Sequence, residues 1–255
     1  MTNNLVQIAN KLRIFSIDAQ WENIEKLPEL LNNVTKILHW EEEERRRRHL
    51  DLLARKNGLK KFDMMSGFDW LWPKKIDKEQ IEDFFSLRFM VENVNIVLIG
   101  PNGVGKSMIA QNLVYSASQQ GYSSLFVESA RMLDDLITQT TNVGLERALQ
   151  RYVKPKLLAI DEVGYLAYDS RHADLLFQLM NRRTKNSSTI ITTNRPFAEW
   201  PSVFPNAASV TALVDRLIER CEVSKIDGDS YRAKRFKERE ITRVKNRKSI
   251  GSPLL

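Results

Sequence analysis

One short glycine-rich stretch limits the possible folds of this chain more than any other feature. Residues 100–107 read GPNGVGKS, which matches the pattern GxxxxGK[ST], and they follow a β-branched run, NIVLI, at residues 95–99. A helix-compatible stretch begins at Lys106 and ends before Gly121. In this setting the glycines let backbone N–H groups surround phosphate oxygens, and the helix N-terminus adds partial positive charge. The motif predicts a nucleotide-binding loop that consists of Gly100, Pro101, Asn102, Gly103, Val104, Gly105, Lys106, Ser107 and Met108.

Two side chains of this loop and two that end a later strand form a predicted catalytic set. Lys106 would reach the β- and γ-phosphates of the nucleotide, and the Ser107 hydroxyl would ligate Mg²⁺. The apolar stretch LLAIDE at residues 157–162 predicts a strand ending in Asp161, which would hold the Mg²⁺ through water. Glu162 beside it would polarise the attacking water. ATP and Mg²⁺ are therefore the expected cofactors, and ATP hydrolysis is the expected reaction.

A further polar side chain follows another apolar run. Residues 188–194 read STIITTN, so Asn194 comes directly after a predicted buried strand. Its amide could orient the attacking water between the third strand and the γ-phosphate. An asparagine at the end of a strand is also a common turn residue, so the residue type alone leaves both interpretations open.

The second half of the chain alternates between predicted strands and helices. Short apolar runs predict strands at residues 95–99, 125–127, 156–160 and 188–193. Continuous apolar strands separated by helices are typical of a parallel sheet that is covered on both faces. Residues 80–92 and the amphipathic part of 163–187 each predict one helix. The expected class is α/β, with a parallel β-sheet flanked by helices.

The residues before this alternating region have a different pattern. Apolar residues recur at helical spacing over residues 5–55, and no glycine occurs before Gly58. Aromatic residues, glycines and Pro73 then interrupt the pattern, and they favour a linker packed on the next domain more than a base-stacking surface. We predict four parts: a small all-α N-terminal domain, a linker, an ATPase domain and a basic C-terminal tail, at residues 1–57, 58–78, 79–232 and 233–255.

A block of charge lies within the helical region. Residues 41–48 read EEEERRRR, so each glutamate precedes an arginine by four residues. That order is the favourable one for ion pairs on a helix. The pairs would surround the helix and leave no apolar face, which is typical of a helix bridging two domains. We interpret the block as a stiff helical connector rather than a DNA-binding surface, with the pairs Glu41–Arg45, Glu42–Arg46, Glu43–Arg47 and Glu44–Arg48.

Positive charge is concentrated near the C-terminus. Nine basic and two acidic residues lie between Arg232 and Lys248, so this segment carries a net charge of +7, which equals that of the whole chain. A basic segment on a neutral body favours a polyanionic partner, with nucleic acid as the first candidate. A solvated terminus without a partner is the alternative. The candidate DNA contacts are Lys234, Arg235 and Lys237.

Several longer motifs carry a family resemblance. IDEVGYL, LLFQLMNRR, STIITTNRPFAEW, LVDRLIER and IDGDSYR lie at residues 160–166, 175–183, 188–200, 213–220 and 226–232. Together with GPNGVGKS they resemble the AAA+ P-loop NTPases, and more narrowly the IstB-like transposition helper ATPases, which are related to the DnaC helicase loader. Three positions differ from the usual pattern, because Ser107 replaces Thr, Met108 stands where His is frequent, and Asn102 stands where Pro is common. None of these changes removes a catalytic group.

The resemblance implies roles for residues that the pattern alone does not identify. Asn194 would be the sensor-1 residue. Arg216 would be an arginine finger that reaches the γ-phosphate in a neighbouring subunit, with Arg220, one helical turn away, as the alternative. Arg232 would be a sensor-2 arginine that acts within its own subunit and contacts the nucleotide.

The expected function follows from the nucleotide motifs, the basic segment and the resemblance. We expect a DNA-binding ATPase that assists a transposase, assembles with ATP into an oligomer or ring on duplex DNA largely without regard to sequence, and uses hydrolysis to control release or transposase activation. A DnaC-like helicase loader is the alternative, because both groups share the ATPase core. A small-molecule kinase fits less well, because residues 163–187 look like one helix rather than an arginine-rich lid.

Composition bounds where such a protein would work. The chain has one cysteine, no apolar run near the roughly 20 residues that span a bilayer, and no secretion signal at its N-terminus. We therefore expect a soluble, cytoplasmic protein with no membrane partner.

Overall fold

A computed structural model describes residues 2–59, 62–165, 168–204 and 207–250 of the 255-residue chain. Side-chain surroundings are described for these residues except 2–4, 46, 49, 207–209, 241 and 243–250. The chain divides into two compact units, residues 1–55 and 56–255. Each unit is described by itself below.

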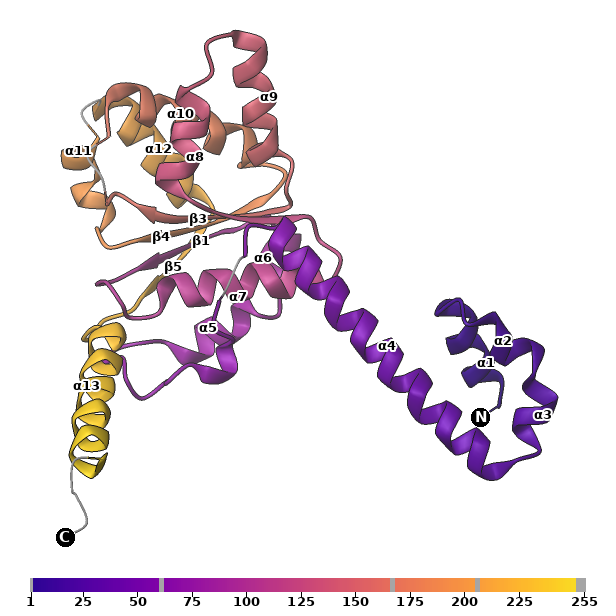
Figure 1. Cartoon of the computed structure of the whole chain (residues 1–255). Helices are drawn as coiled ribbons and strands as arrows, with labels where there is room; N and C mark the ends of the chain where they lie inside the picture. The colour runs from indigo at the N-terminus through magenta and orange to yellow at the C-terminus, as the bar shows by residue number, and fades with distance from the viewer. Residues whose placement is uncertain (1, 60–61, 166–167, 205–206, 251–255) are drawn as a thin grey trace. The chain divides into compact units, whose positions relative to one another are not determined.

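The first unit is helical, as the apolar spacing predicts. Its core consists of the fully or nearly fully buried Ala9, Leu12 and Leu38, against which partly buried apolar side chains pack. Pro28 is the first residue of the longest helix, where its missing N–H costs no helical hydrogen bond. The helices are α1 (Thr2–Lys11), α2 (Phe15–Ala19), α3 (Trp21–Glu25) and α4 (Pro28–Lys56) (Figure 1).

The EEEERRRR block lies inside α4. Two of the four expected ion pairs are present, Glu41–Arg45 at 2.6 Å and Glu44–Arg48 at 2.8 Å. The prediction of a Glu43–Arg47 pair is wrong, because the Arg47 guanidinium pairs instead with Glu44, three residues earlier, at 2.9 Å. The Arg46 side chain lies outside the described residues.

The same block also contacts the end of α1. The Lys11 ammonium pairs with Glu42 at 2.8 Å, and the Arg45 guanidinium donates to the Leu12 carbonyl at 2.7 Å. That carbonyl follows the last turn of α1, where helix carbonyls lack intrahelical partners. The interpretation as a pure connector is therefore incomplete, because part of the block holds the N-terminal unit together.

The second unit contains a five-stranded parallel sheet of order β2-β3-β4-β1-β5. The strands are β1 (Asn95–Ile99), β2 (Ser124–Glu128), β3 (Leu157–Val163), β4 (Ser188–Thr193) and β5 (Cys221–Lys225). Four of them match the predicted runs, and β3 continues three residues beyond its predicted end. The sequence did not predict β5, because this edge strand carries charges, lacks a continuous apolar run and has only one buried residue, Ser224.

Helices cover both faces of this sheet, as expected (Figure 1). One face bears α7 (Lys106–Gln119), and the other bears α8 (Ser129–Ile137), α9 (Asn142–Val153), α10 (Ser170–Arg183) and α12 (Ala207–Glu219). The predicted helix at 80–92 is two helices, α5 (Lys78–Phe84) and α6 (Arg88–Val91), because Leu87 adopts a left-handed conformation with φ 60°. The predicted helix within 163–187 is α10 alone.

Parallel pairing brings the carboxyl ends of all five strands to one edge of the sheet. The loop 100–105 follows β1, the pair Asp161–Glu162 lies at the end of β3, and Asn194 follows β4. After β5 the chain forms an isolated antiparallel bridge between Asp227 and Lys75 and enters α13 (Tyr231–Ile250). Three short helices complete the order, namely the 3₁₀ helices η1 (Met65–Gly67) and η2 (Phe197–Glu199) and the α-helix α11 (Trp200–Val203). No helix in the described part of the chain combines the length and apolar character needed to cross a membrane.

Candidate nucleotide-binding site

The loop between β1 and α7 depends on its glycines. Gly103 and Gly105 have φ values of +79° and +105°, in the left-handed region that side chains disfavour. A Cβ on Gly105 would lie 2.4 Å from the Phe68 ring, and one on Gly103 would lie 2.3 Å from the Ser230 hydroxyl. The loop is therefore held between two segments that flank it, and only glycine fits at these positions.

Lys106 is buried beneath this loop. Its ammonium donates to the backbone carbonyls of Gly100 at 2.6 Å and Pro101 at 2.7 Å. Burial lowers the pKa of Lys106 to about 8, and the nearby carboxylate of Asp161 opposes this shift. The ammonium is thus a cation already taken out of water at the base of a phosphate-binding loop.

Ser107 and Asp161 meet across the gap between α7 and β3. The Ser107 hydroxyl donates to Asp161 Oδ1 at 2.9 Å, and the Thr192 hydroxyl donates to the same oxygen. Burial raises the pKa of Asp161, while these two hydrogen bonds act against the rise. A hydroxyl and a carboxylate side by side are hard oxygen donors of the kind that Mg²⁺ prefers, so this pair fits the ion.

Glu162 has an unusual backbone. Its φ is 61°, and the pairing of β3 with β4 shifts register between Ile160 and Val163 around it. Its N–H donates to Thr192 Oγ1 at 2.9 Å, and its carbonyl accepts from Ser129 Oγ at 2.9 Å. A non-glycine residue in this region costs about 1–3 kcal/mol and persists where neighbours fix it. The bulge turns Glu162 into the cavity, where burial and then Asp161 raise its pKa.

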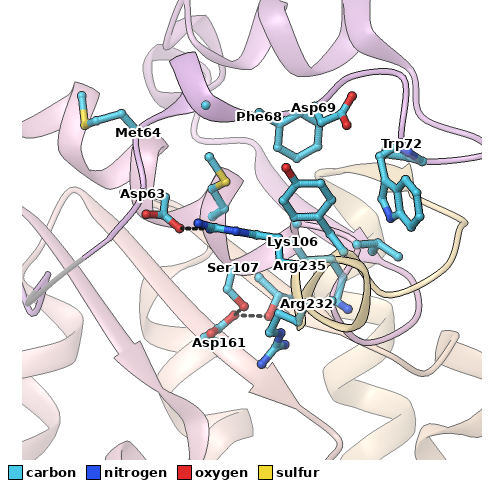
Figure 2. A pocket seen from close by; sticks show the side chains of 18 of the residues that line it. Asp63, Met64, Phe68, Asp69, Trp72, Lys106, Ser107, Asp161, Arg232 and Arg235 are labelled. Atoms are coloured by element: carbon cyan, nitrogen blue, oxygen red, sulfur yellow. Dashed lines mark hydrogen bonds and ion pairs between the residues drawn. The ribbon is translucent and has the colours of Figure 1, made fainter. Parts of the chain in front are cut away.

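A cavity of about 710 Å³ lies above these groups, within the range of small-molecule sites. It is lined by the loop residues Gly103–Met108, by Asp161, Glu162 and Tyr165, and by Thr192. Two further segments form its other walls (Figure 2). The first, called the aromatic segment below, is residues 63–73, and it contributes Asp63, Met64, Ser66, Gly67, Phe68, Asp69, Trp72 and Pro73. The second is the start of α13, and it contributes Tyr231, Arg232 and Arg235.

The aromatic segment forms the wall over the phosphate loop. The Phe68 ring lies against Gly105 and meets Trp70 edge-on at 4.8 Å. The Trp72 indole N–H donates to the Asp229 carbonyl at 2.8 Å. The Asn112 side chain on α7 secures the start of this segment by accepting from the Met65 N–H and donating to the Asp63 carbonyl.

The first turns of α13 form the opposite wall. Arg232 lines the cavity, and its charge acts on the pKa values of Lys106, Glu162 and Tyr165. Arg235 lies 3.9 Å from the Asp63 carboxylate (Figure 2).

Lys234 contacts residues of both walls. Its ammonium pairs with Asp69 at 3.3 Å and lies 4.3 Å from the centre of the Trp72 ring and 5.3 Å from that of Tyr231. Of the three candidate DNA contacts, Arg235 thus lines the cavity, Lys234 contacts residues of its walls, and Lys237 is exposed on α13. DNA binding by these residues stays a prediction.

Asn194 and Arg216 lie outside the cavity lining, as do the predicted loop residues Gly100, Pro101 and Asn102. Asn194 follows β4, and its buried Oδ1 has no hydrogen-bond partner among the described residues. Arg216 is exposed on α12, where its guanidinium is 3.5 Å from Glu219. The Arg220 carbonyl accepts from the Asn95 N–H at 2.8 Å. A role in a neighbouring subunit for either arginine stays a prediction.

Several lining residues were not predicted from the sequence. Thr192 links Asp161 to the Glu162 backbone, Tyr165 hydrogen-bonds Asn102, and Tyr231 packs beside Trp72 at 6.0 Å between ring centres. Their only sequence signal is proximity, since each lies within three residues of a predicted site residue. The aromatic segment has no such signal, because it meets the loop through tertiary contacts.

A parallel sheet with this strand order, a phosphate-binding loop after β1 and an Asp-Glu pair at the end of β3 define an AAA+ P-loop NTPase. The profile of the IstB-like ATP binding proteins matches residues 11–239. This chain belongs to that family.

Individual relatives agree with this assignment. The protein named for ATP binding in insertion sequence IS232 of Bacillus thuringiensis subsp. berliner is 41% identical over 167 residues, which cover 66% of this chain and 67% of the relative. The corresponding protein of an IS21-like insertion sequence from Bacteroides fragilis is 29% identical over 246 residues and 89% of each chain. The crystal structure of DnaI has the same fold, with a TM-score of 0.55 and 18% identity over 64% of this chain and 90% of that chain.

Proposed function

We propose that this ATP-binding protein is a Mg²⁺-dependent ATPase that assembles on duplex DNA when it holds ATP and assists a transposase. One observation carries the proposal. The first turns of α13 line the same cavity as the phosphate loop and the Asp161–Glu162 pair, and the rest of α13 is the basic segment of the chain. A change of nucleotide at one end of this helix would therefore act on the surface that carries its positive charge.

The cavity supports hydrolysis through a division of roles. Lys106 and the loop N–H groups would bind the phosphates, while Ser107 and Asp161 would hold Mg²⁺. Glu162 would take a proton from the attacking water, and Asn194, which follows β4 at the same edge of the sheet, would help to orient that water. ATP supplies the phosphoanhydride bond that is broken. Arg232, at the cavity wall, would offset the negative charge of the phosphates.

The basic helix supports binding to the DNA backbone rather than to particular bases. Lys237 and Arg239 are exposed, and the segment carries a charge of +7. Such contacts neutralise phosphates and release counterions, so affinity should fall steeply with salt and vary little with sequence. The exposed Arg216 would complete the site of a neighbouring copy, with Arg220 as the alternative, which would tie assembly to ATP.

The comparisons favour a role in transposition over helicase loading. The relatives that match most of this chain are named for insertion sequences, whereas the likeness to DnaI concerns the fold alone. A helicase-loading activity has no comparable support from any feature of the site.

The test measures duplex binding by fluorescence anisotropy with ATP, with ADP and without nucleotide, over a series of salt concentrations. We expect ATP to strengthen binding, and we expect Lys106→Ala to abolish that gain and the ATPase activity together. Sizing in the same buffers should show an ATP-dependent oligomer that Arg216→Ala weakens. A duplex affinity that changes with neither salt nor nucleotide would contradict the proposal. In a separate pull-down with both candidate partners, binding of a replicative helicase instead of a transposase would favour the alternative.

A further inference from the structure

Tyr165 connects the two halves of the catalytic cavity. It lies three residues after Glu162, beyond a turn at Gly164 whose φ is +88°. Its phenol hydroxyl donates to Oδ1 of Asn102, in the middle of the phosphate loop, and its side chain lines the cavity. The Tyr165 side chain therefore links the segment that bears Glu162, the proposed base, to the loop that would hold the phosphates.

The position of Asn102 places this contact at the far end of the phosphate chain. The Lys106 ammonium, which would bind the β- and γ-phosphates, donates to the carbonyl of Pro101, the residue before Asn102. Glu162, which would activate water for attack on the γ-phosphate, lines the same cavity as Tyr165. The hydroxyl of Tyr165 thus lies where the γ-phosphate of ATP would be present and where ADP would have none.

The chemistry of the hydroxyl suits a phosphate contact. Burial, and then the negative charges of Glu162 and Asp161, raise the pKa of Tyr165, so the phenol keeps its proton and remains a donor at neutral pH. Its present acceptor, an amide oxygen, is neutral. A phosphate oxygen is charged, and hydrogen bonds to charged acceptors are roughly twice as strong as those between neutral groups.

We propose that the Tyr165 hydroxyl leaves Asn102 for the γ-phosphate when ATP binds, so that Tyr165 is the residue by which this site distinguishes ATP from ADP. This inference rests on the proposed ATPase function. Without a γ-phosphate the hydroxyl stays on Asn102, and Tyr165 is held to the phosphate loop. With ATP, Tyr165 is held to the nucleotide itself.

The test compares ATP and ADP affinities by isothermal titration calorimetry in a Glu162→Gln background, which prevents turnover. Tyr165→Phe removes only the hydroxyl. We expect it to weaken ATP binding about tenfold, because one hydrogen bond to a charged group is lost, and to leave ADP binding within about twofold. Tyr122→Phe is the matched control, because Tyr122 lies before β2 at the other end of the sheet and should change neither affinity.

A second variant tests whether the hydroxyl acts on the nucleotide or through the loop. Asn102→Ala removes the resting acceptor but not the Tyr165 hydroxyl, so the ratio of ATP affinity to ADP affinity should not fall, whatever the substitution does to the two affinities together. The proposal is overturned if Tyr165→Phe weakens ATP and ADP equally, if it changes neither, or if Asn102→Ala weakens ATP as selectively as Tyr165→Phe. If the Glu162→Gln parent itself binds no ATP, the proposed ATPase function fails first, which is a distinct result.

Discussion

Two buried cations lie at opposite ends of the same sheet, and their surroundings differ. Arg183 ends α10 near the start of β4 and is completely buried. Its three nitrogens donate to four backbone carbonyls and one hydroxyl at 2.6–3.0 Å, namely those of Tyr152, Val153, Pro155, Ser188 and Thr189. Lys106, at the carboxyl ends of the strands, donates to two carbonyls.

The number of hydrogen-bond acceptors around each cation distinguishes a structural role from a ligand-binding role. An ammonium has three N–H donors, so among the described residues Lys106 keeps one for a ligand, and it faces a cavity. Burial lowers the pKa of Lys106 to about 8 and that of Arg183 to about 9, so both remain charged at neutral pH. A buried cation that is enclosed by five acceptors and does not line the cavity stabilises the fold, whereas one with two acceptors and a spare donor at a cavity is available to bind an anion. This contrast can be tested from both ends of the sheet.

The largest effect is expected at the carboxyl end. Glu162→Gln keeps the shape of the side chain and the left-handed backbone but removes the base, so ATP turnover should fall by about 10²–10⁴-fold. ATP binding should remain, and the ATP-bound oligomer should accumulate. Steady-state phosphate release measures turnover, and calorimetry measures ATP binding. Glu146→Gln, at an exposed ion pair with Arg182, is the control and should retain turnover. Turnover within tenfold of the parent would exclude Glu162 as the base.

The amino end should respond in stability instead. Arg183→Met leaves four carbonyls without their buried donor, each at a cost of about 1–3 kcal/mol that removal of the buried charge partly offsets, so we expect the free energy of unfolding to fall by about 3–5 kcal/mol. Urea denaturation followed by tryptophan fluorescence measures the change, and nucleotide affinity of the folded variant should stay within about twofold. The neighbouring Arg182→Met is the control, because this exposed pair with Glu146 contributes at most about 1 kcal/mol. Equal losses in the two variants would remove the distinction between the ends.

Lys106 should show the opposite pattern from Arg183. In the absence of nucleotide, Lys106→Met should change the free energy of unfolding by no more than about 1 kcal/mol, since loss of two hydrogen bonds is offset by removal of a buried charge. Mg²⁺ and ATP at a hundred times the dissociation constant should stabilise the parent by about 2.7 kcal/mol. The variant should lose this gain. Thermal melts of the parent and the variant, with and without Mg²⁺ and ATP, measure both stabilities. If Lys106→Met is as unstable as Arg183→Met, the role of Lys106 is mainly structural.

The sequence predicted the elements of this sheet that have strong local signals. NIVLI, LLAI and STIITT are apolar enough to mark buried parallel strands, and GPNGVGKS marks the loop between β1 and α7. Because parallel strands end at one edge, the convergence of Lys106, Ser107, Asp161 and Glu162 could also be expected.

Other features depend on tertiary contacts that local patterns do not encode. The strand β5 lies at an edge and lacks an apolar run, and the break at Leu87 is a single left-handed residue. The aromatic segment is held at the phosphate loop by contacts with distant residues, among them Asn112, Asp229 and Lys234. The position of Lys234 also depends on tertiary contacts. Its charge suggested DNA binding, whereas its ammonium contacts Asp69 and Trp72.

The smallest effect distinguishes the two roles of the basic helix. Lys234→Gln removes an ion pair and a cation–π contact together worth about 1 kcal/mol, so backbone amides of residues 63–73 should exchange hydrogen about fivefold faster. Lys237→Gln should leave that exchange unchanged. If Lys237 contacts a DNA phosphate, its variant should instead reduce the slope of log affinity against log salt by about 1. The reverse result, a smaller slope for Lys234→Gln with unchanged exchange, would assign Lys234 to the DNA surface rather than to the cavity wall.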